Sequence, residues 1–126
     1  MKFVVTEDNI STDLGYGKLN ISPNEEEGFR PFQLLVSSLV GCSSIVFRRI
    51  LEKQRITFEE FTVEADVERN EDEANKLEKV SLTFKIKGDN LDEKKLQRNL
   101  EISRKHCSMV RSVEDSIEVV ETLQVL

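Results

Sequence analysis

The sequence predicts an α+β fold, with antiparallel strands around one long central helix. Three observations support this prediction. Apolar residues recur with a helical period from Pro31 to about Arg55, two stretches between residues 61 and 86 alternate strictly between apolar and polar, and a last alternating stretch covers 117–125. The 126 residues have the length of one ordinary domain, which can bury a core without disulfides or a structural metal. No linker or repeat interrupts the chain, so we expect residues 1–126 to form a single domain.

Short strands joined by turns are predicted for the first 30 residues. Apolar residues alternate there over short distances, and glycines and a Ser22-Pro23-Asn24 cluster interrupt them. The alternating residues are Phe3, Val5, Leu14, Tyr16, Leu19 and Ile21.

The long helix is predicted to begin at Pro31, a residue that suits the first turn because its missing N–H would have no partner there. The apolar residues that set its period are Leu35, Leu39, Cys42, Val46 and Ile50. Further apolar residues make its first four turns hydrophobic nearly all round, and such a helix must be covered on every side. A chain of this size has little else to cover it. We therefore expect a second subunit to supply part of the cover through a two-fold interface.

A strand pair and a second helix are predicted next. Residues 61–67 and 80–86 each place apolar side chains on one face, and the polar stretch 70–76 connects them as an antiparallel pair. Asn90 is predicted to cap a helix over 91–105, with Glu93 three residues later in the manner of a capping box. That helix is expected to lie on the surface and to bury Leu96, Leu100 and either Ile102 or Ser103. The final strand is Ile117 to Val125.

Charge and hydropathy exclude several classes of partner. The chain carries 18 Lys and Arg against 24 Asp and Glu, for a net charge of -6, and it has no basic cluster longer than Arg104-Lys105-His106. Nucleic acid binding needs a stripe of cations, so we expect none. The uncharged stretch 31–47 falls short of the roughly 20 apolar residues that span a bilayer. The N-terminus lacks a secretory apolar region, so we expect a cytoplasmic protein that does not bind membranes.

No metal or cofactor site is expected. The two cysteines, Cys42 and Cys107, lie 65 positions apart and have no zinc-ligand spacing. His106 is the only histidine, and Gly15-Tyr16-Gly17 lacks the third glycine of a dinucleotide fingerprint. The cysteines are therefore the main candidates for chemistry.

Two interpretations of each cysteine stay open. Cys42 falls in the middle of the predicted helix, where burial without a nearby cation would raise its pKa and leave an inert core residue. Cys107 follows Arg104-Lys105-His106 and precedes Arg111, and positive charge there would favour the thiolate. A helix-end cysteine among solvated bases is equally compatible with that pattern. In a reducing cytosol the pair is either two inert thiols or a redox couple.

Both cysteine segments resemble the OsmC/Ohr proteins, the osmotically inducible and organic hydroperoxide resistance proteins. Residues 31–42, PFQLLVSSLVGC, are similar to the Pro-x-(Glu/Gln)-Leu helix of that family, which ends in Ala/Gly-Cys. Residues 106–119, HCSMVRSVEDSIEV, are similar to its second cysteine motif. The element order agrees with the family over nearly the whole chain.

The resemblance implies an OsmC-like fold, an intertwined α+β homodimer with its active sites at the subunit boundary. It implies that Cys42 attacks the O–O bond of an organic hydroperoxide and becomes a sulfenic acid, and that Cys107 resolves it to a disulfide. An external dithiol would then reduce this disulfide.

The residues that assist the first cysteine differ from the family pattern. Active members use an N-terminal Arg together with a Glu near the start of the long helix. Residues 1–29 contain no Arg, and Phe32 and Gln33 stand where the Glu is expected. Arg30 and Gln33 are therefore predicted to assist Cys42. The alternative is a weak or inactive OsmC-like dimer that binds an apolar small molecule at its interface.

Overall fold

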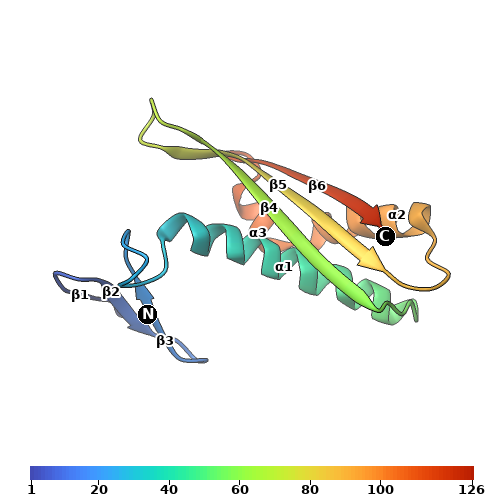
Figure 1. Cartoon of the computed structure of the whole chain (residues 1–126), viewed down its shortest axis with the longest axis horizontal. Coiled ribbons are helices and arrows are strands. Elements are labelled where there is room, and N and C mark those ends of the chain that lie inside the picture. The colour runs from blue at the N-terminus through green and yellow to red at the C-terminus, as the bar shows by residue number, and fades with distance from the viewer. The chain divides into compact units, whose positions relative to one another are not determined.

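The computed structural model describes all 126 residues. They form two compact units, residues 1–37 and 38–126, which are considered in turn. Figure 1 shows the order of the elements along the chain.

The N-terminal unit holds a small antiparallel sheet of three strands, β1 (Val4–Val5), β2 (Ile10–Asp13) and β3 (Lys18–Ile21), in the order β1-β2-β3. Short strands were predicted here, but the assignment of Leu14 and Tyr16 to strands is wrong. The two residues lie in the turn between β2 and β3, where the Leu14 N–H donates to the Gly17 carbonyl at 2.9 Å. Two glycines favour this tight turn over continued strand.

Gly28 allows the chain after β3 to fold back against that strand. Ile21 forms a bridge with Phe29, and the Phe29 N–H donates to the Asn20 carbonyl at 2.8 Å. A Cβ at position 28 would lie 2.8 Å from the Asn20 carbonyl carbon and oxygen, closer than real Cβ atoms approach. Only glycine fits this close backbone approach.

Helix α1 (Pro31–Lys53) confirms the prediction of a long helix that begins at Pro31. It ends two residues before the predicted limit, because Arg55 adopts a left-handed φ of 57°. The Ile56 N–H then donates to the Leu51 carbonyl at 2.9 Å, and this bond closes the last turn.

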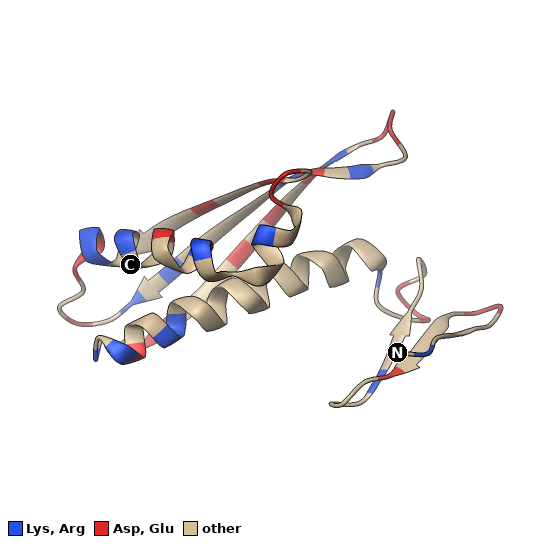
Figure 2. Cartoon of the chain, turned by 180° about the vertical axis from the view of Figure 1, so that it is seen from behind, with Lys and Arg blue, Asp and Glu red and all other residues tan.

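One face of α1 is buried within residues 38–126, and the others are not. Its buried residues recur at steps of four: Leu39, Ser43, Phe47 and Leu51 are each fully buried. Ile45 is 44% exposed, and a Cβ placed on Gly41 would meet nothing within 4 Å. The first charged residue of α1 is Arg48, and Figure 2 shows charged residues only toward the C-terminal end of this helix. The predicted cover of the uncovered faces by a second subunit stays a prediction.

The length and composition of α1 also meet the requirements for a membrane span. Its most apolar 18-residue window has a mean hydropathy of 1.6, and 28% of that window is buried. The core helices of water-soluble proteins satisfy the same two requirements, so this observation is weak evidence for a membrane.

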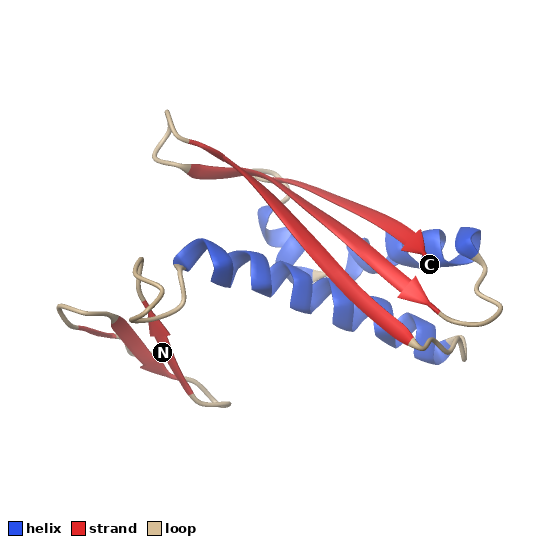
Figure 3. Cartoon of the chain, viewed as in Figure 1, coloured by secondary structure: helices blue, strands red, loops and turns tan.

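The C-terminal unit is a three-stranded sheet with its helices on one side, as Figure 3 shows. Strands β4 (Glu60–Asn70) and β5 (Lys76–Lys87) pair antiparallel, as predicted. Strand β6 (Glu118–Val125) pairs parallel with β5, which corrects the prediction of antiparallel strands alone. The reason lies in the connection, since the helical segments between β5 and β6 carry the chain back to the end of the sheet where β5 begins.

Phenylalanines join α1 to the sheet. The Phe47 ring meets Phe61 of β4 edge to face, with 5.5 Å between ring centroids, and Phe84 of β5 at 5.9 Å. On β5 the alternating pattern predicted the inner face correctly, and its four members are at most 1% exposed: Val80, Leu82, Phe84 and Ile86. This packing orients α1 along the sheet and thereby fixes the positions of the other side chains of α1.

Helix α2 (Glu93–His106) begins at a different cap from the predicted one. Asn90 has a left-handed φ of 57°, and Asp92 caps the helix by accepting from the Lys95 N–H at 3.2 Å. Leu96 and Leu100 are buried as predicted. Of the two alternatives for the third position, Ser103 is buried and Ile102 is 45% exposed.

A short helix, α3 (Ser108–Val113), follows α2 after one residue and was not predicted. Cys107, the residue between them, has an extended backbone with φ -85° and ψ 106°. This change of direction separates the two helices and places Cys107 at the junction.

Candidate functional site

The two cysteines, distant in the sequence, meet in the C-terminal unit. Cys42 lies midway along α1, and Cys107 lies at the junction of α2 and α3. Each cysteine influences the ionisation of the other, and the two are not joined by a disulfide. The two thiols that a resolving step requires therefore belong to one cluster in the reduced protein.

Two serines complete a crossed arrangement around the sulfurs. The Ser43 hydroxyl, on α1, donates to Cys107 Sγ at 3.4 Å. Ser108 Oγ, at the start of α3, lies 3.7 Å from Cys42 Sγ. Each cysteine is thus paired with the serine that follows the other cysteine in the sequence.

Cys42 has an environment that favours its thiolate. Burial is the largest single influence and opposes ionisation, but the Met109 N–H, the Cys107 thiol, the Ser108 hydroxyl and the Ser108 N–H outweigh it. Together these donors lower the pKa of Cys42 below its ordinary value. All four donors are neutral, and all come from residues 107–109. Cys42 is also the less buried of the two cysteines.

Cys107 has the opposite environment. It is fully buried, and this burial is the main reason that its pKa is raised. Hydrogen bonds from the Ser43 hydroxyl and the Val110 N–H lower the pKa in part, while the neighbouring Cys42 raises it further.

Two interpretations of Cys107 were left open, a thiolate favoured by the basic residues before it and a helix-end cysteine among solvated bases. The structure does not support the first, because Arg104 donates to the Val119 carbonyl at 2.6 Å and lies 3.4 Å from a Glu121 oxygen. Lys105 and His106 are exposed. An inert core residue without a nearby cation was one of the two interpretations of Cys42, but neutral donors from a segment 65 positions away lower its pKa.

Arg30 and Gln33, the predicted assistants, belong to the N-terminal unit. The Arg30 guanidinium lies over the Phe32 ring, 5.0 Å from its centroid. The Gln33 N–H donates to the Arg30 carbonyl at 3.1 Å, in the first turn of α1.

The residues that sequence reasoning missed are Ser43, Ser108 and the backbone of Met109. One signal was available, because the dipeptide Cys-Ser occurs at both cysteines. The spacing alone could not show that the two dipeptides meet. The donor from Met109 carries no sequence signal, since any residue except proline supplies a backbone N–H.

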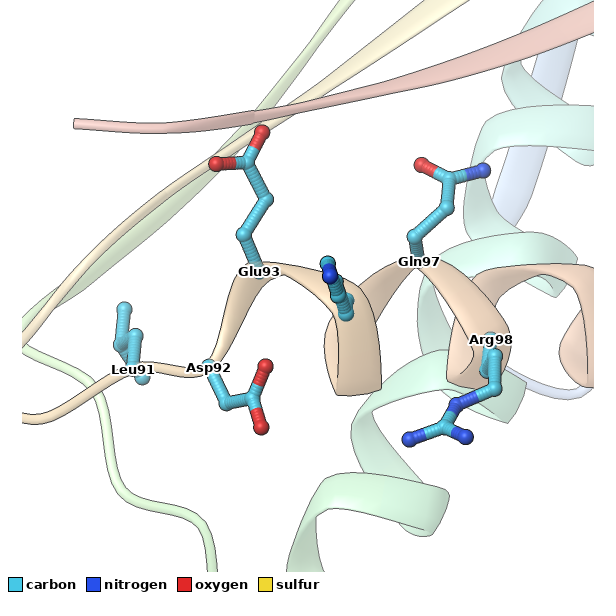
Figure 4. A pocket seen from close by; sticks show the side chains of 6 residues that line it. Leu91, Asp92, Glu93, Gln97 and Arg98 are labelled. Atoms are coloured by element: carbon cyan, nitrogen blue, oxygen red, sulfur yellow. The ribbon is translucent and has the colours of Figure 1, made fainter.

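The largest pocket described on the surface is not at the thiols. It has a volume of about 830 Å³ and is lined by Leu91, Asp92, Glu93, Lys94, Gln97 and Arg98, at the start of α2. Figure 4 shows that Glu93 and Gln97 point to one side of the helix while Asp92 and Arg98 point to the other. Side chains that diverge in this way do not converge on a ligand.

Groups that could hold a metal are absent from residues 1–126, where no three His, Cys, Asp or Glu side chains cluster. The chemistry available at the cysteine pair is therefore that of sulfur. A partly buried, acidified thiol in the same cluster as a fully buried one can be oxidised and then captured as a disulfide.

Comparison with known proteins identifies the same architecture. A family model described as OsmC-like protein matches residues 23–122. No curated protein matches the chain significantly by sequence.

Solved structures of low sequence identity share the fold. A hypothetical protein from Aquifex aeolicus is 20% identical, with a TM-score of 0.87 over 99% of this chain and 93% of that one. An organic hydroperoxide resistance protein OsmC from Legionella pneumophila is 15% identical, with a TM-score of 0.74 over 99% and 98%. OhrB of Bacillus subtilis, an organic hydroperoxide resistance protein, is 17% identical, with a TM-score of 0.66 over 98% and 95%.

Proposed function

Because this chain belongs to the OsmC-like protein family, we propose that it is a thiol-dependent peroxidase that reduces organic hydroperoxides. The observation that carries the proposal is one cluster that holds a partly buried Cys42, whose pKa is lowered, and a fully buried Cys107, with each sulfur hydrogen-bonded to the serine that follows the other cysteine. Proteins of the same fold that are named organic hydroperoxide resistance proteins support this choice of substrate class.

The reaction proceeds in three balanced steps. The Cys42 thiolate attacks the O–O bond, so that the sulfur takes one oxygen as a sulfenic acid and the other leaves, with a proton, as an alcohol. The Cys107 sulfur then displaces the hydroxyl group, forming a disulfide and releasing water. An external dithiol exchanges with this disulfide and returns both thiols.

Burial supports the two proposed roles. The hydroperoxide must reach the attacking residue, and Cys42 is partly buried whereas Cys107 is fully buried. Cys107 needs to reach only Cys42, which belongs to the same cluster. Arg30 and Gln33 are included in the proposal as assistants that help to ionise and orient Cys42.

The working unit is proposed to be a homodimer. The uncovered faces of α1, with an exposed Ile45 and an open Gly41, support a second copy as the missing cover.

Since nothing lies within 4 Å of a Cβ on Gly41, a Gly41→Arg substitution should leave the protomer folded and weaken the dimer. Sedimentation analysis reads the mass, and a wild-type mass near 14.5 kDa at micromolar concentration would contradict the dimer.

The direct test of the peroxidase mixes the reduced protein with cumene hydroperoxide and follows free thiols. Rapid loss of both thiols is expected, and Cys42→Ser should abolish it. Thiol loss no faster than that of free cysteine would refute the proposal. Hydrogen peroxide at equal concentration serves as the comparison substrate and should react more slowly.

A second candidate function is binding of an apolar small molecule without efficient peroxidase chemistry. A pocket of about 460 Å³ beside α1 and β4 favours it, because its lining is largely apolar: Val40, Ser44, Ile45, Arg48, Phe58, Phe61 and Val63. Binding of a fluorescent apolar probe by a protein that fails the thiol test would support this alternative. Loss of that binding in Phe61→Ala would place the probe in this pocket.

A further inference from the structure

We propose that Ser43 promotes the second chemical step. Its hydroxyl holds a hydrogen bond to Cys107 Sγ and stabilises that sulfur as the thiolate that attacks the Cys42 sulfenic acid. The inference rests on the proposed peroxidase function and adds a catalytic residue to it, next to Cys42 in the sequence.

The geometry of Ser43 singles it out for this task. Ser43 and Cys107 are both fully buried, and the hydroxyl lies 3.4 Å from the sulfur. A serine in the middle of a helix commonly bonds the carbonyl four residues earlier. The Ser43 hydroxyl instead donates across to a reactive atom on another segment.

The resolving step creates the need for such a donor. Cys107 must carry negative charge as it attacks, yet its burial raises its pKa. A hydrogen bond from a neutral hydroxyl to an anion is stronger inside a protein than in water, because little solvent competes for it. Ser43 and the Val110 N–H are the two donors that lower the pKa of Cys107 in part against the effect of its burial.

The proton balance is compatible with this role. Once Cys42 is a sulfenic acid, Cys107 first loses its S–H proton to solvent and attacks as the thiolate, and a proton from solvent joins the departing hydroxyl group, which leaves as water. The S–O bond of Cys42 breaks as the S–S bond forms. The Ser43 proton stays on its oxygen throughout, and its hydrogen bond stabilises the Cys107 sulfur while that sulfur is charged.

The two serines of the site act on different steps. Ser108 Oγ faces Cys42 Sγ at 3.7 Å and therefore supports the attack on the hydroperoxide. Ser43 faces Cys107 and supports resolution. Ser43→Ala should consequently slow disulfide formation without slowing formation of the sulfenic acid.

Ser44→Ala is the matched control. Ser44 is the next residue on α1, and its buried hydroxyl has no hydrogen-bond partner. Each substitution removes the same atom from neighbouring positions of one helix. Only Ser43→Ala removes a hydrogen bond to sulfur.

The first measurement needs no peroxidase activity. In a Cys42→Ser background Cys107 is the only thiol, and the ultraviolet absorbance of its thiolate is titrated against pH. Adding Ser43→Ala should move this titration to higher pH, while Ser44→Ala should not move it. Ser43→Thr, which keeps a hydroxyl, should titrate near the parent. A titration unchanged by Ser43→Ala would overturn the proposal.

The second measurement separates the steps in an otherwise wild-type chain. After rapid mixing with cumene hydroperoxide, a dimedone-type reagent traps the sulfenic acid and non-reducing electrophoresis follows the disulfide. Ser43→Ala should slow disulfide formation about two- to tenfold, the rate equivalent of one hydrogen bond, with sulfenic acid formed at the parental rate. Equal slowing of both steps, or of neither, would refute the assignment. If no variant consumes hydroperoxide, the proposed function fails, and the titration alone decides the role of Ser43.

Discussion

The neighbourhoods of Cys42 and Cys107 differ although the two thiols belong to one cluster. Cys42 is partly exposed and receives hydrogen bonds from two backbone N–H groups, a hydroxyl and a thiol, so its pKa is lowered. Cys107 is fully buried, and its fewer donors do not offset that burial, so its pKa is raised. Proximity alone therefore does not make two thiols equivalent. Burial and the number of donors decide which one ionises first.

The comparison also shows that this acidity does not depend on a cation. Every donor to Cys42 is neutral and comes from residues 107–109. The basic residues beside Cys107 in the sequence leave its pKa raised, because Arg104 is directed toward Val119 and Glu121 of β6. Orientation therefore decides whether a charge that is close in sequence acts on a group.

Removing each cysteine should give the largest and most distinct effects. Cys42→Ser should reduce hydroperoxide consumption more than about a thousandfold, as loss of a nucleophile does. Cys107→Ser should keep the first turnover and accumulate the Cys42 sulfenic acid, which mass spectrometry detects. Equal loss of the first turnover in both variants would remove the distinction between the two sulfurs.

The next largest effect is expected in how the reaction rates of the two thiols depend on pH. The thiolate is the reactive form, so the rate of each rises with pH through its own pKa. Cys42, measured in Cys107→Ser, should reach its plateau at lower pH than Cys107, measured in Cys42→Ser. At neutral pH we expect Cys42 to react faster than Cys107, because a larger fraction of the thiol with the lower pKa is ionised. Alkylation by iodoacetamide across a pH series measures both, and a reversed order would contradict the comparison.

Loss of the Ser108 hydroxyl should weaken only the Cys42 side. Ser108→Ala should raise the pKa of Cys42 and slow its reaction with hydroperoxide about two- to tenfold, the equivalent of one hydrogen bond. Ser112→Ala is the control, because the Ser112 hydroxyl donates to the Ser108 carbonyl at 2.7 Å. An effect of Ser112→Ala as large as that of Ser108→Ala would point to the stability of α3 instead.

Glu121 tests the effect of burial on a pKa at a position away from the thiols. Burial raises the pKa of Glu121 even though Arg104 lowers it in part, and one carboxylate oxygen has no partner. A carboxyl group whose pKa is higher in the folded state than in the unfolded state contributes to the stability of the fold through its protonated form. This contribution is fully present below the pKa of the unfolded state and is lost as the pH rises through the pKa of the folded state. Glu121→Gln should remove this pH dependence, with a change in unfolding free energy of about 1 kcal/mol or less at neutral pH. Urea unfolding at pH 4 and pH 7 measures it, and a parental pH slope in the variant would show that Glu121 is not the cause.

The smallest effect is expected at Arg30. The donors that lower the pKa of Cys42 all come from residues 107–109, so Arg30→Ala should leave most of its acidity in place. We expect the rate with cumene hydroperoxide to fall by at most about fivefold, the range of one partly exposed charge. A much larger loss, together with a raised pKa of Cys42, would mean that the neutral donors are insufficient.

The sequence by itself determined the elements with strong periodicity. Helix α1 begins at Pro31 as its apolar spacing predicts, and the inner face of β5 is the one that its alternation predicts. Burial of one face produces such patterns directly, so they can be read without coordinates. The two cysteine motifs also indicated the family, because they retain residue types in a recognisable order.

Only the tertiary structure decided which thiol is acidic, which serines meet the sulfurs and how β6 pairs. Cys42 obtains its donors from residues 107–109, which the chain brings to it only after the intervening strands and helices have folded. The parallel register of β6 likewise depends on the path through α2 and α3. These properties come from contacts between distant segments, and no local pattern of residue types encodes such a contact.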